Sequence, residues 1–282
     1  MLTFSSFFKH KSDNRFIAAL ATLLFLALPA HAEDATDNDS SLEQIHQVIV
    51  NSYYSVNGFY NFSANQADKD QKAVIDDAIK AIDDYMAPLS DKLDNDPLSE
   101  QFATAASAQF ATAAENWKTY KNILKQNVAE VVNTGYPDLR LAGDMADSNI
   151  AFNGSMQALY NNLREKEKPS ELTETSRSAA RTLALMMTKY SARTTSTVSQ
   201  VYSGGDAEIT IDALASQFEA LVGKLTSLTT DNATAIDLLD SAKTKWEFIK
   251  KSYVNYNENR VNFIVNLYSK KIISDIESTT QG

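Results

Sequence analysis

The stretch DKDQKAVIDDAIKAIDDYMAPLSDKL, residues 68–93, shows most clearly which kind of fold the chain adopts. Its apolar residues recur three or four positions apart, which places them on one side of an α-helix. That stripe consists of Val74, Ile75, Ile79, Ile82, Met86, Leu89 and Leu93. The opposite side carries Asp76, Asp77, Asp83 and Asp84. The pattern predicts an amphipathic helix that buries one face against neighbouring helices.

The same helical spacing continues along most of the chain, interrupted by recognisable start and stop signals. A capping box formed by Ser41 and Gln44 predicts the first helix start, Asp96 before Pro97 another, and Ser170 with Thr173 a third. Gly135 and the Gly204–Gly205 pair predict helix ends. Helices are predicted over about 41–60, 68–93, 96–133, 137–168, 170–203, 211–228, 232–254 and 258–278.

The composition excludes most other fold classes. The 282 residues include only 8 glycines and 5 prolines, where average usage gives about 34 of the two together. A Rossmann unit or a β-sandwich needs more turn-forming residues than that. Long helices joined by short polar turns are typical of antiparallel neighbours. The sequence therefore predicts an all-α fold, an elongated antiparallel helical bundle with long helices.

The first 32 residues have the three parts of a secretory signal peptide. Lys9, Lys11 and Arg15 precede an apolar run over 16–28, and an Ala-His-Ala site ends at Ala32. We expect cleavage after Ala32, a flexible acidic leader over 33–40, and a periplasmic or secreted protein that does not span the membrane. The net charge of −10 argues against nucleic acid as a partner, because phosphate backbones attract basic proteins.

The two halves of the remaining chain resemble each other. Trp117 and Trp246 both lie in lysine-containing helical segments, and Leu89–Leu93 matches Leu221–Leu225 upstream of them. This order predicts a first helical module over 41–168 and a second over 169–282, arranged as two tandem related bundles. Shared helical periodicity is the alternative explanation, because it produces such matches by chance.

Residues suited to catalysis are scarce. His46 is the single histidine after residue 32, and we interpret it as an ordinary helix-surface histidine. The chain has no cysteine and no nucleophile-elbow glycine pattern. We therefore expect no enzyme activity, no catalytic residues, no metal site and no cofactor.

One helix carries an unusual group of basic residues for so acidic a protein. Arg177, Arg181 and Lys189 lie on the helix predicted over 170–203, among apolar residues that would be buried. An arginine in such surroundings needs a negative partner. Two interpretations remain open: an ion pair with Glu174 or with another helix, or binding of a small anionic ligand.

This helix also carries a family resemblance. The stretch RSAARTLALMMTKY, residues 177–190, resembles the signature helix of the type IV pili methyl-accepting chemotaxis transducer N-terminal domain. That family is related to the sensor domains of nitrate/nitrite histidine kinases. The signature positions are occupied by Arg181, Leu183, Met187 and Lys189, whereas Ser178, Leu185 and Met186 depart from it. The resemblance covers mainly 169–253 and implies a helical periplasmic sensor domain with an anion site.

The resemblance and the residues together lead to an expectation about function. We expect a soluble periplasmic sensor-like binding or interaction protein, with Arg181, Arg177 and Lys189 as candidate ligand-binding residues. Its partner would be a membrane receptor, a kinase or a pilus component, since the predicted mature chain contains no output domain. The alternative is a structural or assembly protein of the cell envelope without a small ligand, and the sequence leaves a homodimer open.

Overall fold

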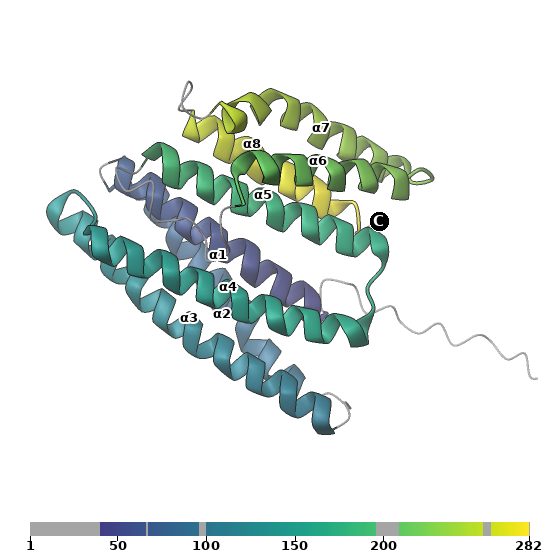
Figure 1. Cartoon of the computed structure of the whole chain (residues 1–282), viewed down its shortest axis with the longest axis horizontal. Coiled ribbons are helices and arrows are strands. Elements are labelled where there is room, and N and C mark those ends of the chain that lie inside the picture. Colours follow the sequence, from purple (N-terminus) through teal and green to yellow (C-terminus); the bar gives the residue numbers. More distant parts are fainter. Residues whose placement is uncertain (1–39, 66, 96–99, 196–208, 256–260, 282) are drawn as a thin grey trace, which may run out of the picture. The chain divides into compact units, whose positions relative to one another are not determined.

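The computed structural model describes residues 40–65, 67–95, 100–195, 209–255 and 261–281. Within these ranges 90% of the residues are helical, which confirms the all-α prediction. The predicted signal peptide and most of the leader lie outside the described residues. The eight described helices, labelled in Figure 1, are α1 Ser41–Ala64, α2 Lys69–Asn95, α3 Glu100–Thr134, α4 Leu139–Glu167, α5 Glu171–Thr195, α6 Ile211–Leu228, α7 Ala233–Val254 and α8 Asn262–Ser278.

Most predicted helix ends agree with the structure, and the differences have local causes. α1 is capped by Ser40 and not by Ser41, because the Ser40 hydroxyl accepts the Glu43 amide at 3.1 Å. α4 begins after Asp138, whose carboxylate accepts the Leu141 amide, and not at Pro137. α5 is described only to Thr195, so the predicted stop at 204–205 lies outside the described residues. The predicted start at 96–97 lies outside them too.

The helices pack in the same order in both halves of the chain. α1 packs on α2 and α4, and α3 packs on α2 and α4. Correspondingly, α5 packs on α6 and α8, and α7 packs on α6 and α8. α1 and α5 also pack against each other, so the two neighbouring groups of helices in Figure 1 are joined through these two helices. The predicted boundary at 168/169 stays a prediction.

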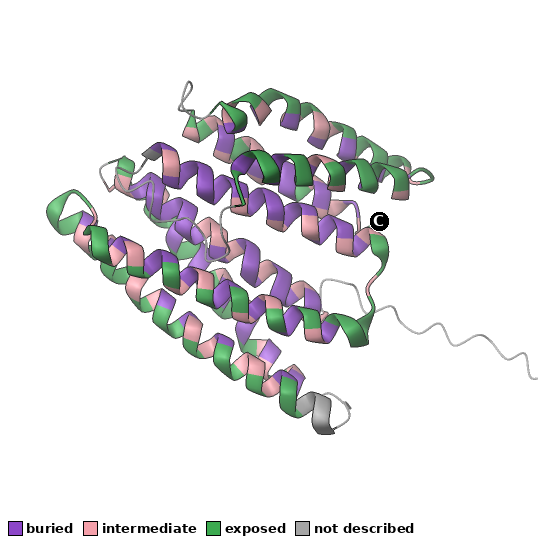
Figure 2. Cartoon of the chain, viewed as in Figure 1, coloured by how far each residue is buried: buried purple, intermediate pink, exposed green. Residues whose placement is uncertain are grey.

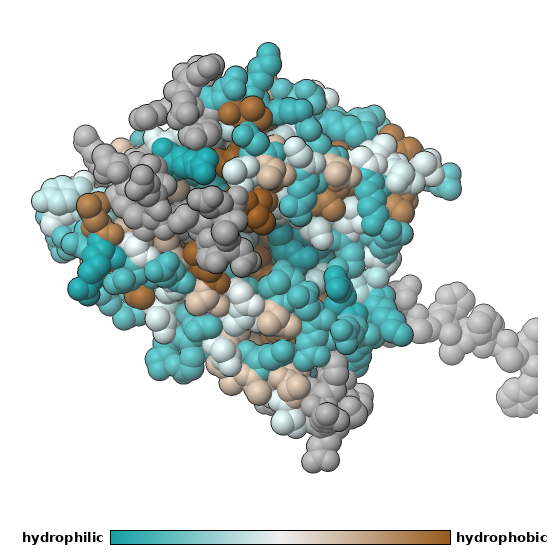
Figure 3. Space-filling model, in the orientation of Figure 1, coloured by the Kyte–Doolittle hydropathy of each residue, from teal (hydrophilic) through white to brown (hydrophobic). Residues whose placement is uncertain are grey.

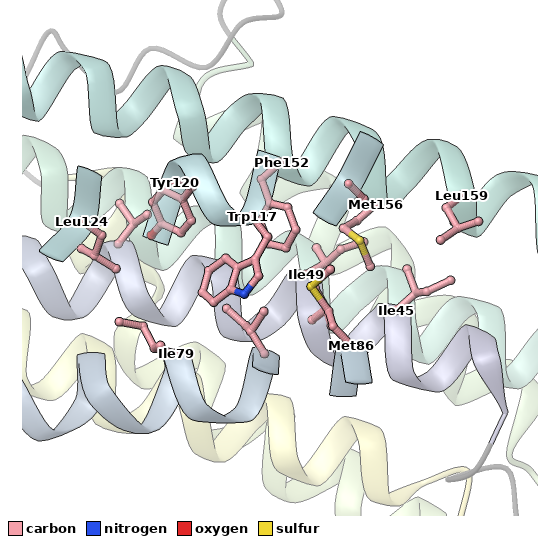
Figure 4. Packing of buried hydrophobic residues seen from close by; sticks show 14 of the residues in the cluster. Ile45, Ile49, Ile79, Met86, Trp117, Tyr120, Leu124, Phe152, Met156 and Leu159 are labelled. Atoms are coloured by element: carbon pink, nitrogen blue, oxygen red, sulfur yellow. The ribbon is translucent and has the colours of Figure 1, made fainter. Parts of the chain in front are cut away.

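The buried hydrophobic residues form two clusters. The first draws almost entirely on α1–α4 and includes an aromatic group in which Trp117 lies 5.2 Å from Phe152 between ring centroids. Figure 4 shows these rings between the helices, with Ile45, Ile49 and Met86 packed nearby. The second cluster draws on α5–α8 and contains Val50 of α1, just as Ala192 of α5 belongs to the first.

Each tryptophan is fixed by an acidic side chain of the preceding helix. In the first half the indole of Trp117 donates to Asp83 at 2.7 Å, and Lys121, one turn later, contacts the same carboxylate at 2.8 Å. The second half repeats this arrangement. The indole of Trp246 donates to Glu219 at 2.9 Å, and Lys250, one turn later, contacts the same carboxylate. Asp83 had been assigned to the solvent-facing acidic stripe of α2, so the stripe also serves to position α3.

α1 is buried along most of its circumference, as its mainly purple ribbon in Figure 2 shows. Its buried positions include small polar residues as well as apolar ones. Asn57, 2% exposed, donates to Ser191 of α5 at 2.7 Å and to Asn266 of α8 at 3.0 Å. Ser52 accepts from Asn149 of α4 at 2.6 Å. Because these groups need partners when buried, α1 fixes the positions of helices in both halves.

Gly58 allows α1 and α2 to approach each other closely. A Cβ atom on this residue would lie 3.1 Å from Cγ1 of Ile75 and 3.2 Å from Cγ1 of Val74. Gly154, in α4, is also helical, but it is exposed and a Cβ there would meet nothing within 4 Å. The two glycines therefore differ in packing and not in backbone conformation.

We predict that Gly58→Val lowers the free energy of unfolding by about 1–3 kcal/mol, since the added methyl groups overpack the contact with α2. Gly154→Val is the matched control and should be neutral or slightly stabilising, because valine has a somewhat better helix propensity than glycine. Urea denaturation followed by circular dichroism measures both. Equal effects at the two positions would contradict the close packing of α1 and α2.

Candidate functional site

Ionisable side chains from four helices meet where α1, α4, α5 and α8 converge. They approach one another through ion pairs, hydrogen bonds and a ring contact, and several of them are almost completely buried. We call this group the polar seam. It consists of Glu43 and His46 of α1, Tyr160 of α4, Glu174, Arg177 and Arg181 of α5, and Glu277 of α8.

Arg177 forms an ion pair with another helix. Its Nε lies 3.0 Å from Oε2 of Glu43, and the arginine is only 2% exposed. The first turn of α1 therefore supplies the carboxylate, and Glu174 on the same helix does not. The sequence left open an ion pair or a bound anion for these arginines. For Arg177 the structure shows the ion pair.

Glu174 is engaged by α4. It accepts a hydrogen bond from the hydroxyl of Tyr160 and lies 3.4 Å from Nη1 of Arg164. Arg164 is half exposed, so this second contact is open to solvent and contributes little. The carboxylate nevertheless fixes the start of α5 against the end of α4.

Arg181 occupies a different environment from Arg177. Its guanidinium carbon lies 4.3 Å from the centre of the Tyr160 ring, a cation–π arrangement. Its Nη1 is buried and has no hydrogen-bond partner among the described residues. Burial lowers the pKa of Arg181, and the neighbouring Tyr160 and Glu174 offset part of that effect. A buried N–H group without a partner is unfavourable, so a small anion could satisfy this atom.

His46 is not a surface residue, and the expectation from the sequence was wrong. The side chain is fully buried, and its Nε2 lies 2.8 Å from Oε1 of Glu277. Burial, together with Arg181, lowers the pKa of His46 to about 3, so the imidazole is neutral at physiological pH. Its Nδ1 finds no hydrogen-bond partner in the described part of the chain. The residue that covers His46 lies 231 positions away, which helical periodicity within α1 cannot reveal.

Glu277 ends the seam on α8. Its side chain is 22% exposed, and burial raises its pKa from an ordinary value near 4.5 to about 7. Gln47, which donates to the carboxylate at 3.3 Å, and Arg177 oppose that rise. Near neutral pH the Glu277 carboxyl group therefore gains or loses its proton as the pH changes, whereas the imidazole of His46 stays neutral.

Lys189 lies apart from the seam. It is 6% exposed and follows Arg181 by eight residues, about 12 Å along the helix axis. Burial and the nearby Arg193 lower its pKa. The structure thus brings Arg177 and Arg181 together but not Lys189, so the three candidate residues do not form one site.

The sequence analysis missed the residues that complete the seam. Glu43, Tyr160 and Glu277 had no motif that singled them out, because each is one acidic or aromatic residue among many on an amphipathic helix. The only signal was indirect: a buried arginine requires an acidic partner. That requirement does not say which of 36 acidic residues supplies it.

The seam provides neutralised charges and no recognisable nucleophile aligned with a base. In the described ranges no group of three or more histidine, cysteine or acidic residues is placed to hold a metal ion. Nor does any described helix have the length and apolar character needed to cross a membrane. What the seam offers chemically is the unsatisfied guanidinium N–H of Arg181 and the carboxyl group of Glu277, which titrates near neutral pH.

Comparisons with protein-family models, with curated proteins and with solved structures found no match to this chain. The resemblance to the pili transducer domain over 169–253 therefore stays a prediction from the sequence.

We predict that Glu277 makes the protein less stable as the pH rises. Its folded-state pKa is raised, so its favourable contribution is complete below about pH 4.5 and is lost as the pH rises through about 7. Glu277→Gln removes this titration. The variant should gain roughly 2–3 kcal/mol relative to the wild type between pH 5 and pH 8, measured by urea denaturation at each pH.

Glu247→Gln, which replaces an exposed carboxylate on α7, is the control for this experiment. It should shift relative to the wild type by less than about 0.5 kcal/mol over the same interval. A Glu277→Gln variant that changes with pH in parallel with the wild type would show that Glu277 is ionised in the folded protein throughout.

Proposed function

We propose that the protein is a periplasmic, sensor-like binding protein that takes a small anion at Arg181 and acts with a separate signalling or pilus partner. The observation that carries the proposal is the unsatisfied, buried Nη1 of Arg181 next to charges that are otherwise paired. The resemblance of α5 to a sensor signature points to the same residue.

The charge balance of the seam limits the ligand to a small anion. Glu43 neutralises Arg177, and Glu174 is shared between Tyr160 and Arg164. Arg181 is therefore the cation that remains for a ligand. A single guanidinium beside an aromatic ring favours a compact, singly charged group such as a carboxylate. A multiply charged anion would need the second arginine that Met186 replaces in the family signature.

The position of the seam would couple a ligand to the packing of the helices. Arg181 belongs to α5, Tyr160 to α4 and His46 to α1, and burial of His46 depends on α8. A ligand that binds more tightly to one arrangement of these helices shifts the equilibrium towards that arrangement. Such a shift is how a sensor domain would act on a partner.

The second candidate function is a structural or assembly protein of the envelope that binds no small molecule. The ion pair between Arg177 and Glu43 favours it, since one of the two signature-region arginines already has a carboxylate partner within the chain. In that case the seam only holds α1, α4, α5 and α8 together, and Arg181 is stabilised by Tyr160 and Glu174.

Thermal unfolding of the mature protein with added anions separates the two functions. We expect at least one of formate, acetate, nitrate and phosphate to raise the melting temperature, because a ligand at 100 times its Kd adds about 2.7 kcal/mol. Arg181→Ala should abolish that rise. If none of these anions protects the wild type, or if Arg181→Ala is protected equally, the anion proposal is wrong.

Arg177→Ala is the control variant for the same experiment. It should destabilise the protein without ligand by about 3 kcal/mol, since Glu43 is left without its partner. The further change Glu43→Leu in that background should recover part of the loss. The protein should still be protected by the anion, because Arg177 is not the group that binds it.

A further inference from the structure

The outer face of α7 and α8 exposes large hydrophobic side chains. Phe263 is 73% exposed, Phe248 64% and Leu267 38%, and the ring of Tyr268 lies 5.1 Å from that of Phe248. Phe263 and Leu267 are one turn apart on α8 and share a face. We call these four residues the α7–α8 patch. Figure 3 shows that hydrophobic residues are scattered over the visible face between larger areas of hydrophilic ones.

Lysines lie close to the α7–α8 patch, together with one exposed acidic residue, Glu247. The described segments 248–255 and 261–274 contain four lysines and no acidic residue, whereas the chain has a net charge of −10. Lys250 is paired with Glu219, and Lys270 lies over the ring of Tyr54. The two others, Lys251 and Lys271, have exposed side chains.

The first half of the chain provides an internal comparison for this face. Trp246 and Lys250 of α7 occupy the roles of Trp117 and Lys121 of α3. An alignment on these two pairs places Phe248 opposite Thr119 and Lys251 opposite Asn122. Both residues of α3 are exposed and polar. The outer helix of such a bundle can therefore be polar at these positions, so packing within the chain does not require a phenylalanine at position 248.

We propose that the α7–α8 patch binds an acidic amphipathic helix of a partner protein. Two antiparallel helices present a face that a third helix covers, with apolar side chains spaced three or four residues apart. Asp and Glu residues flanking that apolar stripe would meet Lys251 and Lys271. At physiological salt charges more than about 8 Å apart are largely screened, so these near lysines outweigh the distant negative charge of the protein.

The exposed lysines are too few to favour a lipid surface. Recognition of anionic membranes by basic clusters uses about 4–8 lysines or arginines. Of the four lysines near the patch only Lys251 and Lys271 are exposed, and Nζ of Lys271 lies 5.9 Å from the centre of the Tyr268 ring. A second copy of the chain would bring like-charged lysines together if it used the same patch. The proposal rests on the role of the protein as an interaction protein but not on the anion at Arg181, so each can fail separately.

The test uses a designed peptide of about three heptads, with leucine at the first and fourth positions and mainly glutamate elsewhere. A second peptide carries lysine in place of glutamate. Binding to the full mature protein is followed by fluorescence anisotropy at several salt concentrations. We expect the acidic peptide to bind with a Kd of the order of 10 μM and the basic peptide to bind at least tenfold more weakly.

Two variants copy the residues of the first half onto the patch. Phe248→Thr should weaken binding of the acidic peptide at least tenfold, since it removes the central aromatic contact. Lys251→Asn should weaken it about threefold and reduce its salt dependence. Both should leave the melting temperature nearly unchanged, because both side chains are exposed. Val132→Thr, at an exposed apolar position of α3, is the control and should bind like the wild type.

Several results would overturn the proposal. The patch does not bind acidic helices if the acidic peptide fails to bind at about 1 mM, or if it binds Phe248→Thr and the wild type equally. Binding to vesicles of equal parts phosphatidylglycerol and phosphatidylcholine, lost in Phe248→Thr, would identify a membrane surface instead. A concentration-dependent dimer lost in the same variant would identify a second copy of the chain.

Discussion

The fold depends on the burial of polar side chains along α1. His46, Ser52 and Asn57 can be buried only where another helix supplies a hydrogen-bond partner. The partners come from α8 for His46, from α4 for Ser52, and from α5 and α8 for Asn57. One helix of the first half is therefore held by helices of both halves. A purely apolar α1 would permit sliding or rotation that these hydrogen bonds do not.

The same constraint explains why charged residues are found in the seam. Arg177 and Glu43 neutralise each other between α5 and α1, and His46 remains neutral beside Glu277. Such pairs add little net stability compared with apolar packing, but leaving one member alone is costly. The main effect of the seam is therefore to determine how α1, α4, α5 and α8 pack against one another. Arg181 is the exception, since it forms no ion pair with a described residue and its Nη1 is buried without a hydrogen-bond partner. For that reason it is the residue on which the proposed anion binding rests.

The sequence predicts the helices well and the joint between them poorly. Helical periodicity and the glycine and proline signals identify α2 and α6 almost to the residue. They reveal the side on which a helix packs against one neighbour, as the apolar stripe of α2 shows. They fail for α1, because small polar residues such as Asn57 look solvent-exposed until partners from distant segments are known. His46 was misassigned for this reason, and Glu43 and Glu277 could not be singled out.

The central claim is that α1 and α5 form a joint shared by both halves, so the described helices unfold as one cooperative unit. Native-state hydrogen exchange measures this most directly, since it gives an opening free energy for each amide. We expect the slowest amides in α1 and α5, with opening free energies equal to that of global unfolding, and faster exchange in α3 and α7. Two separate plateaus, one for α1–α4 and a different one for α5–α8, would contradict a shared joint and would show two independent bundles.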